Sequence, residues 1–482
     1  MCREGSRIAV AGADQLRIIV ALKKSFRYST FDKYKPRFAT EILMTWKLKT
    51  LAAALLAGLS VGASAMQAAD VTQLSLPNGM KFILVESHTI PNANMYTYWK
   101  VGSRNEVPGI TGLSHFFEHM MFNGSKKFGP KQFDRTMEAA GGANNAYTNK
   151  DVTVYTDWFP ASALPVIFDL ESDRIGHLSI DPKMVESERG VVLSERSTGL
   201  ENSNFRPLFE AVYAAAFTAH PYNIPTIGHE SDIKAWTQQD LEQYFRTYYS
   251  PNNAVAVVVG DFKTADIRKQ IETVFGSLPQ RGLPPLVRTI EPEQKGERRV
   301  FVQKASATTP NLLIGFKAPR SNNEDYYALQ MLKSILADGK TSRLYQALVD
   351  KGLATATGAD YGRSFDPTLF GVYAVGATAV KPAQLEAALL AALDKVVKEG
   401  VTADELQKVK NQRLIDLYRQ QETINGKAAL LGDYEVFFGD YRKLFEAPAD
   451  MKKVTPADIQ RVAAKLFRQS QRTVGVLAAV EE

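Results

Sequence analysis

Apolar and polar residues follow two periods along the chain, and together they predict a mixture of strands and helices. Alternating or continuous apolar residues predict strands at 72–76, 80–85, 95–101, 144–158 and 254–260. Apolar residues three or four apart predict helices at 113–122, 133–140, 161–175, 185–196 and 232–249. The Asn78-Gly79 pair between the first two strands is typical of a β-hairpin turn. Residues 200–228 are expected to be rich in loops.

The second half of the chain repeats the pattern of the first half in outline. A strand at 312–317, a helix at 325–336 and a helical stretch at 385–407 follow one another as 95–101, 113–122 and 164–187 do. Between the halves, residues 278–299 contain four prolines and many charges with weak periodicity, which is typical of a linker. These patterns predict two similar domains, at residues 70–277 and 300–482, joined by that linker.

The first 65 residues differ from the rest of the chain. Residues 44–65 combine a basic start, an apolar run and the small residues Ala63-Ser64-Ala65, which is the pattern of a secretory signal peptide cut after Ala65. The apolar run is too short to span a bilayer as a helix. Because a signal peptide opens a protein, residues 1–43 are expected to be an upstream extension, with the true start at Met44; a genuine leader is the alternative. We therefore expect a periplasmic or secreted chain without a transmembrane segment.

Setting this segment apart changes what the composition implies. The whole chain has a formal net charge of +6, but its first 65 residues contain 11 Lys and Arg against 4 Asp and Glu. The remainder carries 47 basic and 48 acidic residues, so its charge gives no reason to expect nucleic-acid binding. The only cysteine is Cys2. Metal ligands in the rest of the chain must therefore be nitrogen or oxygen atoms, which suits zinc and does not exclude manganese or cobalt.

The helix expected at 113–122 carries the most informative group of residues. His115 and His119 are four residues apart, so a helix places their imidazoles one turn apart on one face, where they could bind the same metal ion. Glu118 lies on the same face and could reach a water molecule there. The order is H-x-x-E-H, which is typical of inverzincins. Two ordinary histidines on a half-buried helix are the alternative, but the sequence holds only 6 histidines, so a chance match is rare.

This motif and five other stretches resemble peptidases of the M16 family. The five are Asn145-Ala146-Tyr147-Thr148, Tyr155, Pro221-Tyr222, Tyr249-Ser250-Pro251-Asn252-Asn253 and Val257-Val258-Val259-Gly260-Asp261. The resemblance runs from about residue 71 to the C-terminus. It implies an α+β fold with two homologous domains, each an antiparallel sheet flanked by helices, which form half of a clamshell. It also implies that the first domain binds the metal and that the second, which has no H-x-x-E-H, is a degenerate metal-free copy.

The resemblance implies one Zn²⁺ ion per chain, bound by His115, His119 and Glu195. Between His119 and Glu195 lie 75 residues, about the distance at which the family has its glutamate ligand. Glu188 precedes Glu195 by two helical turns and faces the same way. The resemblance implies that Glu118 is the general base. It also implies a catalytic role for Glu188, which would orient a histidine ligand or adjust the properties of the metal site. Ordinary solvated carboxylates are the alternative for Glu188 and Glu195.

In the family, the start of the strand expected at 144–158 is an open sheet edge beside the metal. Asn144, Asn145, Ala146 and Tyr147 are therefore expected to contact a peptide substrate that adds to this edge by backbone hydrogen bonds. A turn is the alternative for Asn144-Asn145. Four other histidines are expected to be structural, namely His88, His177, His220 and His229.

One feature of the family is missing. M16 proteins with both halves in one chain have an Arg and a Tyr, seven apart, in the half without metal. Here Val349 and Thr355 stand near those positions, and Arg343 and Tyr345 are only two apart. The resemblance therefore implies a heterodimer with a second M16-like subunit that carries the pair and lacks H-x-x-E-H; a homodimer is the alternative. We expect an exported zinc metalloendopeptidase subunit acting on unfolded peptides or small proteins, with a non-catalytic scaffold or binding subunit as the alternative.

Overall fold

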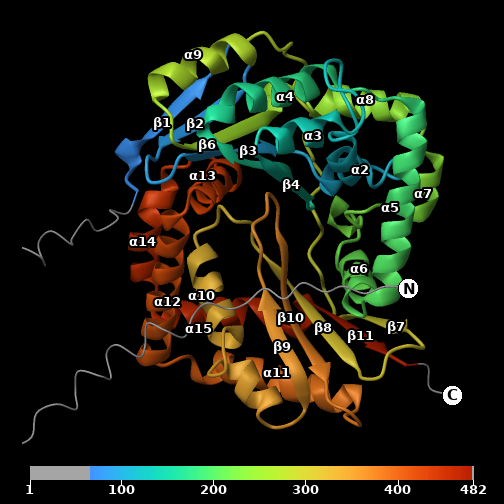
Figure 1. Ribbon diagram of the computed structural model, residues 1–482. Coiled ribbons are helices and arrows are strands. Elements are labelled where there is room, and N and C mark those ends of the chain that lie inside the picture. Colours follow the sequence, from blue (N-terminus) through green and yellow to red (C-terminus); the bar gives the residue numbers. More distant parts are fainter. Residues whose placement is uncertain (1–65, 480–482) are drawn as a thin grey trace, which may run out of the picture. The chain divides into compact units, whose positions relative to one another are not determined.

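The computed structural model of the protein describes residues 66–479 (Figure 1). The predicted upstream extension at 1–43 and the predicted signal peptide at 44–65 lie outside the described residues. Within residues 66–479, no helix is both long enough and apolar enough to cross a membrane. The described chain forms two sheets, and each sheet is built from one half of the sequence.

The first sheet has the strand order β1-β2-β6-β3-β5-β4, which leaves β4 at one edge. Its strands are β1 (Val71–Ser75), β2 (Lys81–Glu86), β3 (Asn92–Trp99), β4 (Ala143–Thr148), β5 (Thr153–Pro160) and β6 (Ala254–Gly260). Neighbouring strands are antiparallel except β2 and β6, which are parallel. The β1–β2 hairpin predicted from the Asn78-Gly79 pair is present, and Gly79 adopts a φ of 86° that suits glycine.

One face of the first sheet is covered by helices of the first half of the chain. Within the described residues, the helices of the first half are α2 (Leu113–Met120), α3 (Gln132–Ala139), α4 (Leu164–His177), α5 (Pro182–Asn202), α6 (Phe205–Ala216), α7 (Glu230–Ala235), α8 (Gln238–Tyr248) and α9 (Thr264–Val274), of which α6 lies on the second sheet instead. Apolar side chains on this face, such as Phe82 and Met95, form one core with residues of α2, α4, α8 and α9. This core holds α2, the helix that carries the H-x-x-E-H motif, beside the sheet.

The second sheet repeats the first. Its strands are β7 (Arg298–Gln303), β8 (Asn311–Ala318), β9 (Ala354–Asp360), β10 (Thr368–Gly376) and β11 (Arg472–Ala478). Their order, β7-β11-β8-β10-β9, corresponds to β2-β6-β3-β5-β4, and β7 and β11 again form a parallel pair. The two homologous domains expected from the sequence are therefore confirmed. Each sheet is mixed, however, because one parallel pair interrupts the antiparallel arrangement that was expected.

The helices of the second half follow the same order without the H-x-x-E-H motif. They are α10 (Tyr326–Ala337), α11 (Pro382–Glu399), α12 (Ala403–Glu422), α13 (Ile424–Phe438), α14 (Lys443–Lys453) and α15 (Pro456–Leu466). Helix α10 comes after β8 as α2 comes after β3, but α10 contains no histidine. The second half thus keeps the architecture of the first and lacks its motif.

Each sheet is covered on one face by a helix that comes from the other half of the chain. Helix α6 of the first half packs on β7, β8 and β11 of the second sheet through Leu208 and Val212. Helix α13 of the second half packs on β3 and β6 of the first sheet (Figure 1). Gly432 permits this close approach, because a Cβ atom there would overlap the ring of Tyr98 in β3. Both faces of β3 and β6 are therefore covered, which explains why both strands are buried almost throughout and why β6 is continuously apolar.

The strand predicted at 144–158 is wrong in its extent, because the chain turns back in the middle of it. The side-chain oxygen of Asn149 accepts hydrogen bonds from the N–H groups of Asp151 at 2.8 Å and Val152 at 2.9 Å. These bonds stabilise a turn, and the stretch becomes the hairpin of β4 and β5. The turn matters for function because it leaves β4 with a single neighbour and one free edge.

Two helical regions also differ from the prediction. The helix predicted at 232–249 is divided into α7 and α8, because Thr237 begins a new helix with a capping box to Asp240. The region at 200–228, predicted to be rich in loops, contains the end of α5 and the whole of α6. The hydroxyl of Ser203 accepts hydrogen bonds from two N–H groups at the start of α6 and stabilises that start.

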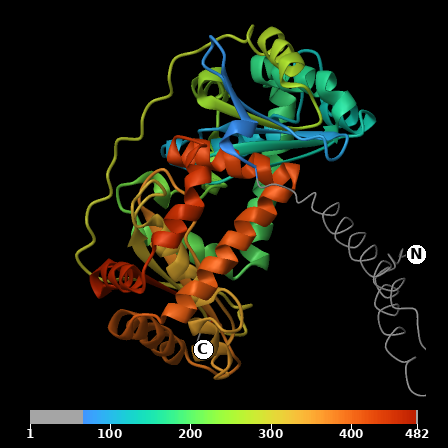
Figure 2. The same cartoon turned by 90° about the vertical axis from the view of Figure 1, so that its left-hand side faces the viewer.

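The segment between the sheets is extended. Residues 279–297 contain no helix or strand and lead from the region of α9 to β7 (Figure 2). Three large apolar side chains in it are exposed, namely Leu283, Leu286 and Ile290. The part of the segment next to β7 is anchored by Glu291. Its carboxylate accepts hydrogen bonds from the N–H groups of Thr218, Ala219 and His220.

Candidate metal centre

Helix α2 is fixed where it begins. Gly112, just before it, has a φ of 91° and lies against the carbonyl of Ile227, so a side chain would not fit there. The buried carboxylate of Glu106 accepts hydrogen bonds from the N–H groups of Gly112 at 2.6 Å and Ser114 at 2.8 Å. These N–H groups have no partner inside the helix, and a carboxylate near a helix N-terminus is stabilising. Glu106 therefore helps to set the direction of α2.

The buried face of α2 packs on an aromatic core. The ring of Phe117 lies 5.3 Å from that of Tyr249 and 5.7 Å from that of Phe245. The hydroxyl of Tyr155 in β5 donates a hydrogen bond of 2.9 Å to the carbonyl of Phe117. With this face buried, the helical period leaves His115, Glu118 and His119 partly exposed on the other.

Two histidines of α2 meet one glutamate of α5. The Oε2 atom of Glu195 lies 3.4 Å from Nε2 of His115 and 3.7 Å from Nε2 of His119. The centres of the two imidazole rings are 4.7 Å apart. One nitrogen or oxygen atom from each residue lies within 4.8 Å of the others, and no second group of this kind occurs within residues 66–479. The three residues singled out by spacing and resemblance are thus brought together.

Helix α5 carries this glutamate and a second one on the same face. The helix begins at Asp181, whose carboxylate accepts hydrogen bonds from the N–H groups of Lys183 and Met184. Val185 and Val192 are its buried apolar residues. Glu188 and Glu195 each follow one of these valines by three residues, so both reach α2 as the helix packs.

Glu188 holds His119 in place. Its Oε1 atom lies 2.7 Å from Nδ1 of His119, and its Oε2 atom accepts a hydrogen bond of 2.8 Å from the side-chain amide of Asn123. The Nε2 atom of His119 is therefore the nitrogen that remains for a metal. By contrast, Nδ1 of His115 is buried and has no hydrogen-bond partner among the described residues.

The protonation of His115 suits metal binding, which requires a neutral imidazole. Burial, helped by the positive charges of His119 and Arg206, lowers the pKa of His115 to about 3. The contact with His119 lowers the pKa of Glu188 and outweighs the opposite effect of burial. Burial alone would lower the pKa of His119, but Glu188 outweighs it and raises this pKa.

The donor atoms fit a zinc ion. Two imidazole nitrogens and one carboxylate oxygen form the kind of three-ligand set that leaves a position open for water in catalytic zinc sites. All three donors are already within a few ångströms of one another in the described structure. His115, His119 and Glu195 could therefore hold such an ion with little rearrangement.

Glu118 lies beside this group without belonging to it. Its side chain is partly exposed and contacts Thr148, the last residue of β4. Burial raises its pKa, and the neighbouring carboxylate of Glu195 adds to this effect. A carboxylate with a raised pKa, held next to a metal position, takes up a proton more readily than an ordinary glutamate.

A cavity of about 400 Å³ opens in front of these residues. Its wall includes His115, Glu118 and Glu195 together with Tyr147 and Thr148 of β4, so it connects the candidate metal centre with the edge of the first sheet. Arg206 of α6 also lines the cavity, and its Nη2 atom lies 3.6 Å from Oε1 of Glu195.

Comparison with protein families identifies the chain. Residues 81–230 match the family described as insulinase (peptidase family M16), and residues 235–413 match the peptidase M16 inactive domain. The zinc protease PqqE of Helicobacter pylori is 30% identical over 406 residues, covering 83% of this chain and 91% of that protein. The chain belongs to the M16 peptidase family. The zinc protease YmxG of Bacillus subtilis, described as uncharacterized, is 26% identical and covers 83% of this chain and 96% of its own.

Solved structures show the same M16 fold. A protease from Helicobacter pylori aligns with a TM-score of 0.82 at 30% identity and covers 84% of this chain and 99% of its own. The periplasmic protease PqqL from Escherichia coli aligns with a TM-score of 0.72 at 20% identity. That match covers 86% of this chain but only 48% of PqqL, whereas the first half of PqqL alone is covered to 94%.

In this M16 chain, the residues expected to contact substrate lie on β4, as predicted, but their side chains differ in availability. The amide of Asn144 donates a hydrogen bond of 3.0 Å to Asp134 of α3. The side-chain oxygen of Asn145 accepts a local hydrogen bond from the N–H of Ala146. Tyr147 is 44% exposed. The features of β4 that remain open to a ligand are therefore its free backbone edge and the ring of Tyr147.

The four histidines expected to be structural lie apart from the candidate metal centre. Three of them contact an aspartate through the imidazole ring, namely His88 with Asp261, His177 with Asp173 and His220 with Asp366. The N–H of His229 donates to the hydroxyl of Thr111. None of them belongs to a group of three potential ligands within the described residues.

The arginine and tyrosine near the missing family pair are not arranged as that pair. Arg343 is held by Glu405 through two hydrogen bonds of 2.9 Å. Tyr345 begins the short helix η7 (Tyr345–Val349), where its side chain is partly buried. Arg343 and Tyr345 therefore do not supply the family's pair.

Three residues at the candidate metal centre were missed by sequence reasoning, namely Glu106, Asn123 and Arg206. Glu106 lies six residues before the N-cap of α2, outside the capping positions that a sequence reveals. Asn123 follows the last turn of α2, where an amide often only ends a helix. Arg206 lies on a helix that was itself predicted as loop, so no periodicity pointed to it.

Proposed function

We propose that this M16 chain is an exported zinc metalloendopeptidase subunit that hydrolyses peptide bonds of unfolded peptides or small proteins. The observation that carries the proposal is the meeting of His115, His119 and Glu195 beside Glu118, in a cavity that reaches the free edge of β4. Relatives named zinc proteases support it. A non-catalytic scaffold or binding subunit is the alternative, and it is disfavoured because all three donors and Glu118 are retained.

A zinc ion held by His115, His119 and Glu195 would supply a Lewis acid that activates water and polarises the peptide carbonyl. Glu118 takes the proton from the attacking water and passes it to the leaving amine. Burial raises the pKa of Glu118, so this carboxylate accepts a proton more readily than an exposed glutamate would. Glu188 keeps His119 in the orientation that turns its Nε2 atom toward the metal position.

The substrate binds as an added strand along β4. The free backbone edge of residues 144–147 offers N–H and carbonyl groups to an extended peptide, and the strand ends at Thr148, beside Glu118. Because such pairing involves the backbone, the peptidase accepts many sequences. It also requires an extended substrate, which favours unfolded peptides.

The domains at 70–277 and 300–482, with the linker at 278–299, form half of a clamshell. We propose that a second M16-like subunit supplies the other half and the missing Arg and Tyr. The match of this chain to the first half of PqqL supports this arrangement. A homodimer is the alternative. The signal-peptide pattern at 44–65 and the description of PqqL as periplasmic support export.

Metal analysis combined with peptide digestion tests the proposal. The purified chain should bind about one zinc ion, and His119→Ala and Glu195→Ala should each weaken that binding. Digestion should rise when an M16-like partner from the same host is added. Turnover that is complete without a partner would reject the heterodimer, and a chain that binds no metal and cleaves no peptide would reject the peptidase.

A further inference from the structure

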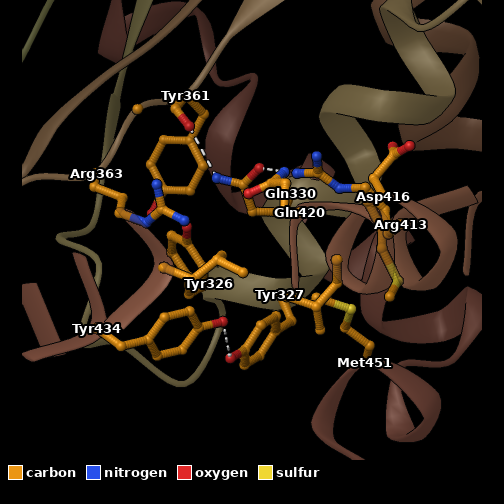
Figure 3. Close-up of a pocket in the computed structure, with 14 residues that line it drawn as sticks. Tyr326, Tyr327, Gln330, Tyr361, Arg363, Arg413, Asp416, Gln420, Tyr434 and Met451 are labelled. Atoms are coloured by element: carbon orange, nitrogen blue, oxygen red, sulfur yellow. Dashed lines mark hydrogen bonds between the residues drawn. The ribbon is translucent and has the colours of Figure 1, made fainter. Parts of the chain in front are cut away.

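A second cavity, of about 270 Å³, lies in the second half of the chain, away from the candidate metal centre (Figure 3). Helices α10, α12, α13 and α14 and the loop after β9 form its walls. It is lined by four tyrosines and two arginines, namely Tyr326, Tyr327, Tyr361, Tyr434, Arg363 and Arg413. Nothing in the peptidase chemistry described above uses these residues.

The two arginines offer hydrogen-bond donors that the protein itself does not satisfy. Arg363 forms an ion pair of 2.7 Å with Asp433 through Nη1, but its Nε–H is buried without a partner among the described residues. Arg413 is half-buried and bonds the neutral side-chain oxygen of Gln330. No carboxylate among residues 66–479 lies within 4.0 Å of the Arg413 guanidinium.

The one acidic residue that lines this cavity does not compensate Arg413. Figure 3 shows the carboxylate of Asp416 pointing away from Gln330, whereas the guanidinium of Arg413 points toward it. The amide nitrogen of Gln330 is already used, because it donates a hydrogen bond of 2.9 Å to the carbonyl of Tyr361. Positively charged hydrogen-bond donors therefore predominate in this cavity. The planar guanidinium group of an arginine can donate to both oxygens of a carboxylate.

A set of neighbouring side chains lies between this cavity and β4. Tyr147 of β4 lines the cavity at the metal centre, and its hydroxyl is close enough to Asp433 and Tyr98 for both to influence its pKa. The hydroxyl of Tyr98 lies 3.3 Å from Oδ1 of Asp433, which in turn holds Arg363. A peptide side chain placed beside Tyr147 would thus lie next to the side chains that lead to Arg363.

We infer that the cavity lined by Arg363 and Arg413 binds a carboxylate of the peptide substrate and anchors acidic peptides along β4. The inference rests on the proposed function, because it takes the ligand to be a peptide paired with β4. Side chains of an added strand alternate between its two faces. Only every second position of the peptide can therefore reach the cavity.

The test uses binding, so that it does not depend on turnover. Fluorescent peptides carrying one glutamate at successive positions, each with a matched glutamine peptide, are titrated into the Glu118→Gln chain loaded with zinc. We expect glutamate to strengthen binding about tenfold at alternating positions, the size of a hydrogen-bonded charge pair. A third peptide, ending in a free carboxylate at the preferred position, distinguishes a chain terminus from a side chain as the source.

Variants of α12 locate the effect. Arg413→Gln should abolish the preference for glutamate, and Arg413→Lys should keep a smaller preference, because it retains the charge but loses the fork. Arg419→Gln is the matched control, since it removes a charge from an exposed position on the same helix and should leave the preference unchanged. Circular dichroism verifies that each variant is folded.

Equal affinities for glutamate and glutamine peptides, or a preference that survives in Arg413→Gln, would overturn the inference. Peptide binding with the expected preference, but no cleavage by the wild-type chain together with its M16-like partner, would contradict the proposed function and leave the carboxylate site supported.

Discussion

The Nδ1 atom of His119 lies 2.7 Å from the Oε1 atom of Glu188, so the second ring nitrogen of His119 is the one turned toward His115 and Glu195. Asn123 fixes Glu188 in turn, through a hydrogen bond to its other oxygen. A carboxylate behind a histidine ligand sets its tautomer and makes it more basic. We therefore propose that Glu188 positions His119 and that its loss lowers the affinity for the metal.

Glu188→Gln should weaken zinc binding roughly 10- to 100-fold, the usual effect of removing such a partner. The affinity is measured by competition with a chromophoric chelator. Glu186→Gln on the same helix is the control, because Glu186 is exposed and its pairing with Arg189 is worth little. Unchanged affinity in Glu188→Gln would show that the contact does not support the metal.

Gly432→Ala should destabilise the protein by about 1–3 kcal/mol, the usual cost of overpacking a core. The added methyl group would overlap the ring of Tyr98 and force α13 away from β3. Chemical denaturation of the variant measures the loss. A variant as stable as the wild type would mean that α13 does not pack tightly on the first sheet.

Gly190→Ala provides the opposite case. Gly190 also lies inside a helix, α5, but a Cβ atom there would meet nothing within 4 Å. Alanine favours the helix over glycine, so the free energy of unfolding should rise by up to about 1 kcal/mol. Destabilisation by this substitution would indicate a contact on α5 that the described residues do not contain.

Glu291→Gln should destabilise the protein in a pH-dependent way. Burial alone would raise the pKa of Glu291, but the N–H groups of residues 218–220 outweigh it and lower this pKa to about 2. A lowered carboxyl pKa stabilises the fold above the unfolded value near 4.5, and this contribution is lost as the pH falls toward 2.

Denaturation at two pH values measures this effect. The variant should lose about 2 kcal/mol at pH 7 and much less at pH 3. Glu293→Gln, at an exposed position in the same segment, is the control and should change neither value. An equal loss at both pH values would mean that the charge of Glu291 does not matter.

The candidate metal centre shows what can be predicted from sequence. His115, Glu118 and His119 lie within one helical turn, so the period alone places them on one face. Glu195 lies on another helix, and only the resemblance to a known family connected it with α2. Physical reasoning from spacing could not have chosen it among the other glutamates of α5.

Features that depend on packing between distant segments could not be predicted. Arg206 reaches Glu195 only because α6 follows α5 closely and then covers the second sheet. The cavity around Arg363 and Arg413 joins a loop after β9 to α12, about 50 residues away. The hairpin turn at Asn149 was readable in principle, because Asn-Lys-Asp is a turn-forming sequence.

Glu118→Gln tests the central claim most directly, because it separates the metal from the chemistry. Zinc content and turnover of an unfolded peptide are measured on the same samples of wild-type and variant protein, with the partner subunit present. We expect equal zinc content and a loss of turnover of at least about 100-fold, since an amide cannot take the proton from water. Near wild-type turnover in a zinc-loaded Glu118→Gln protein would contradict the account.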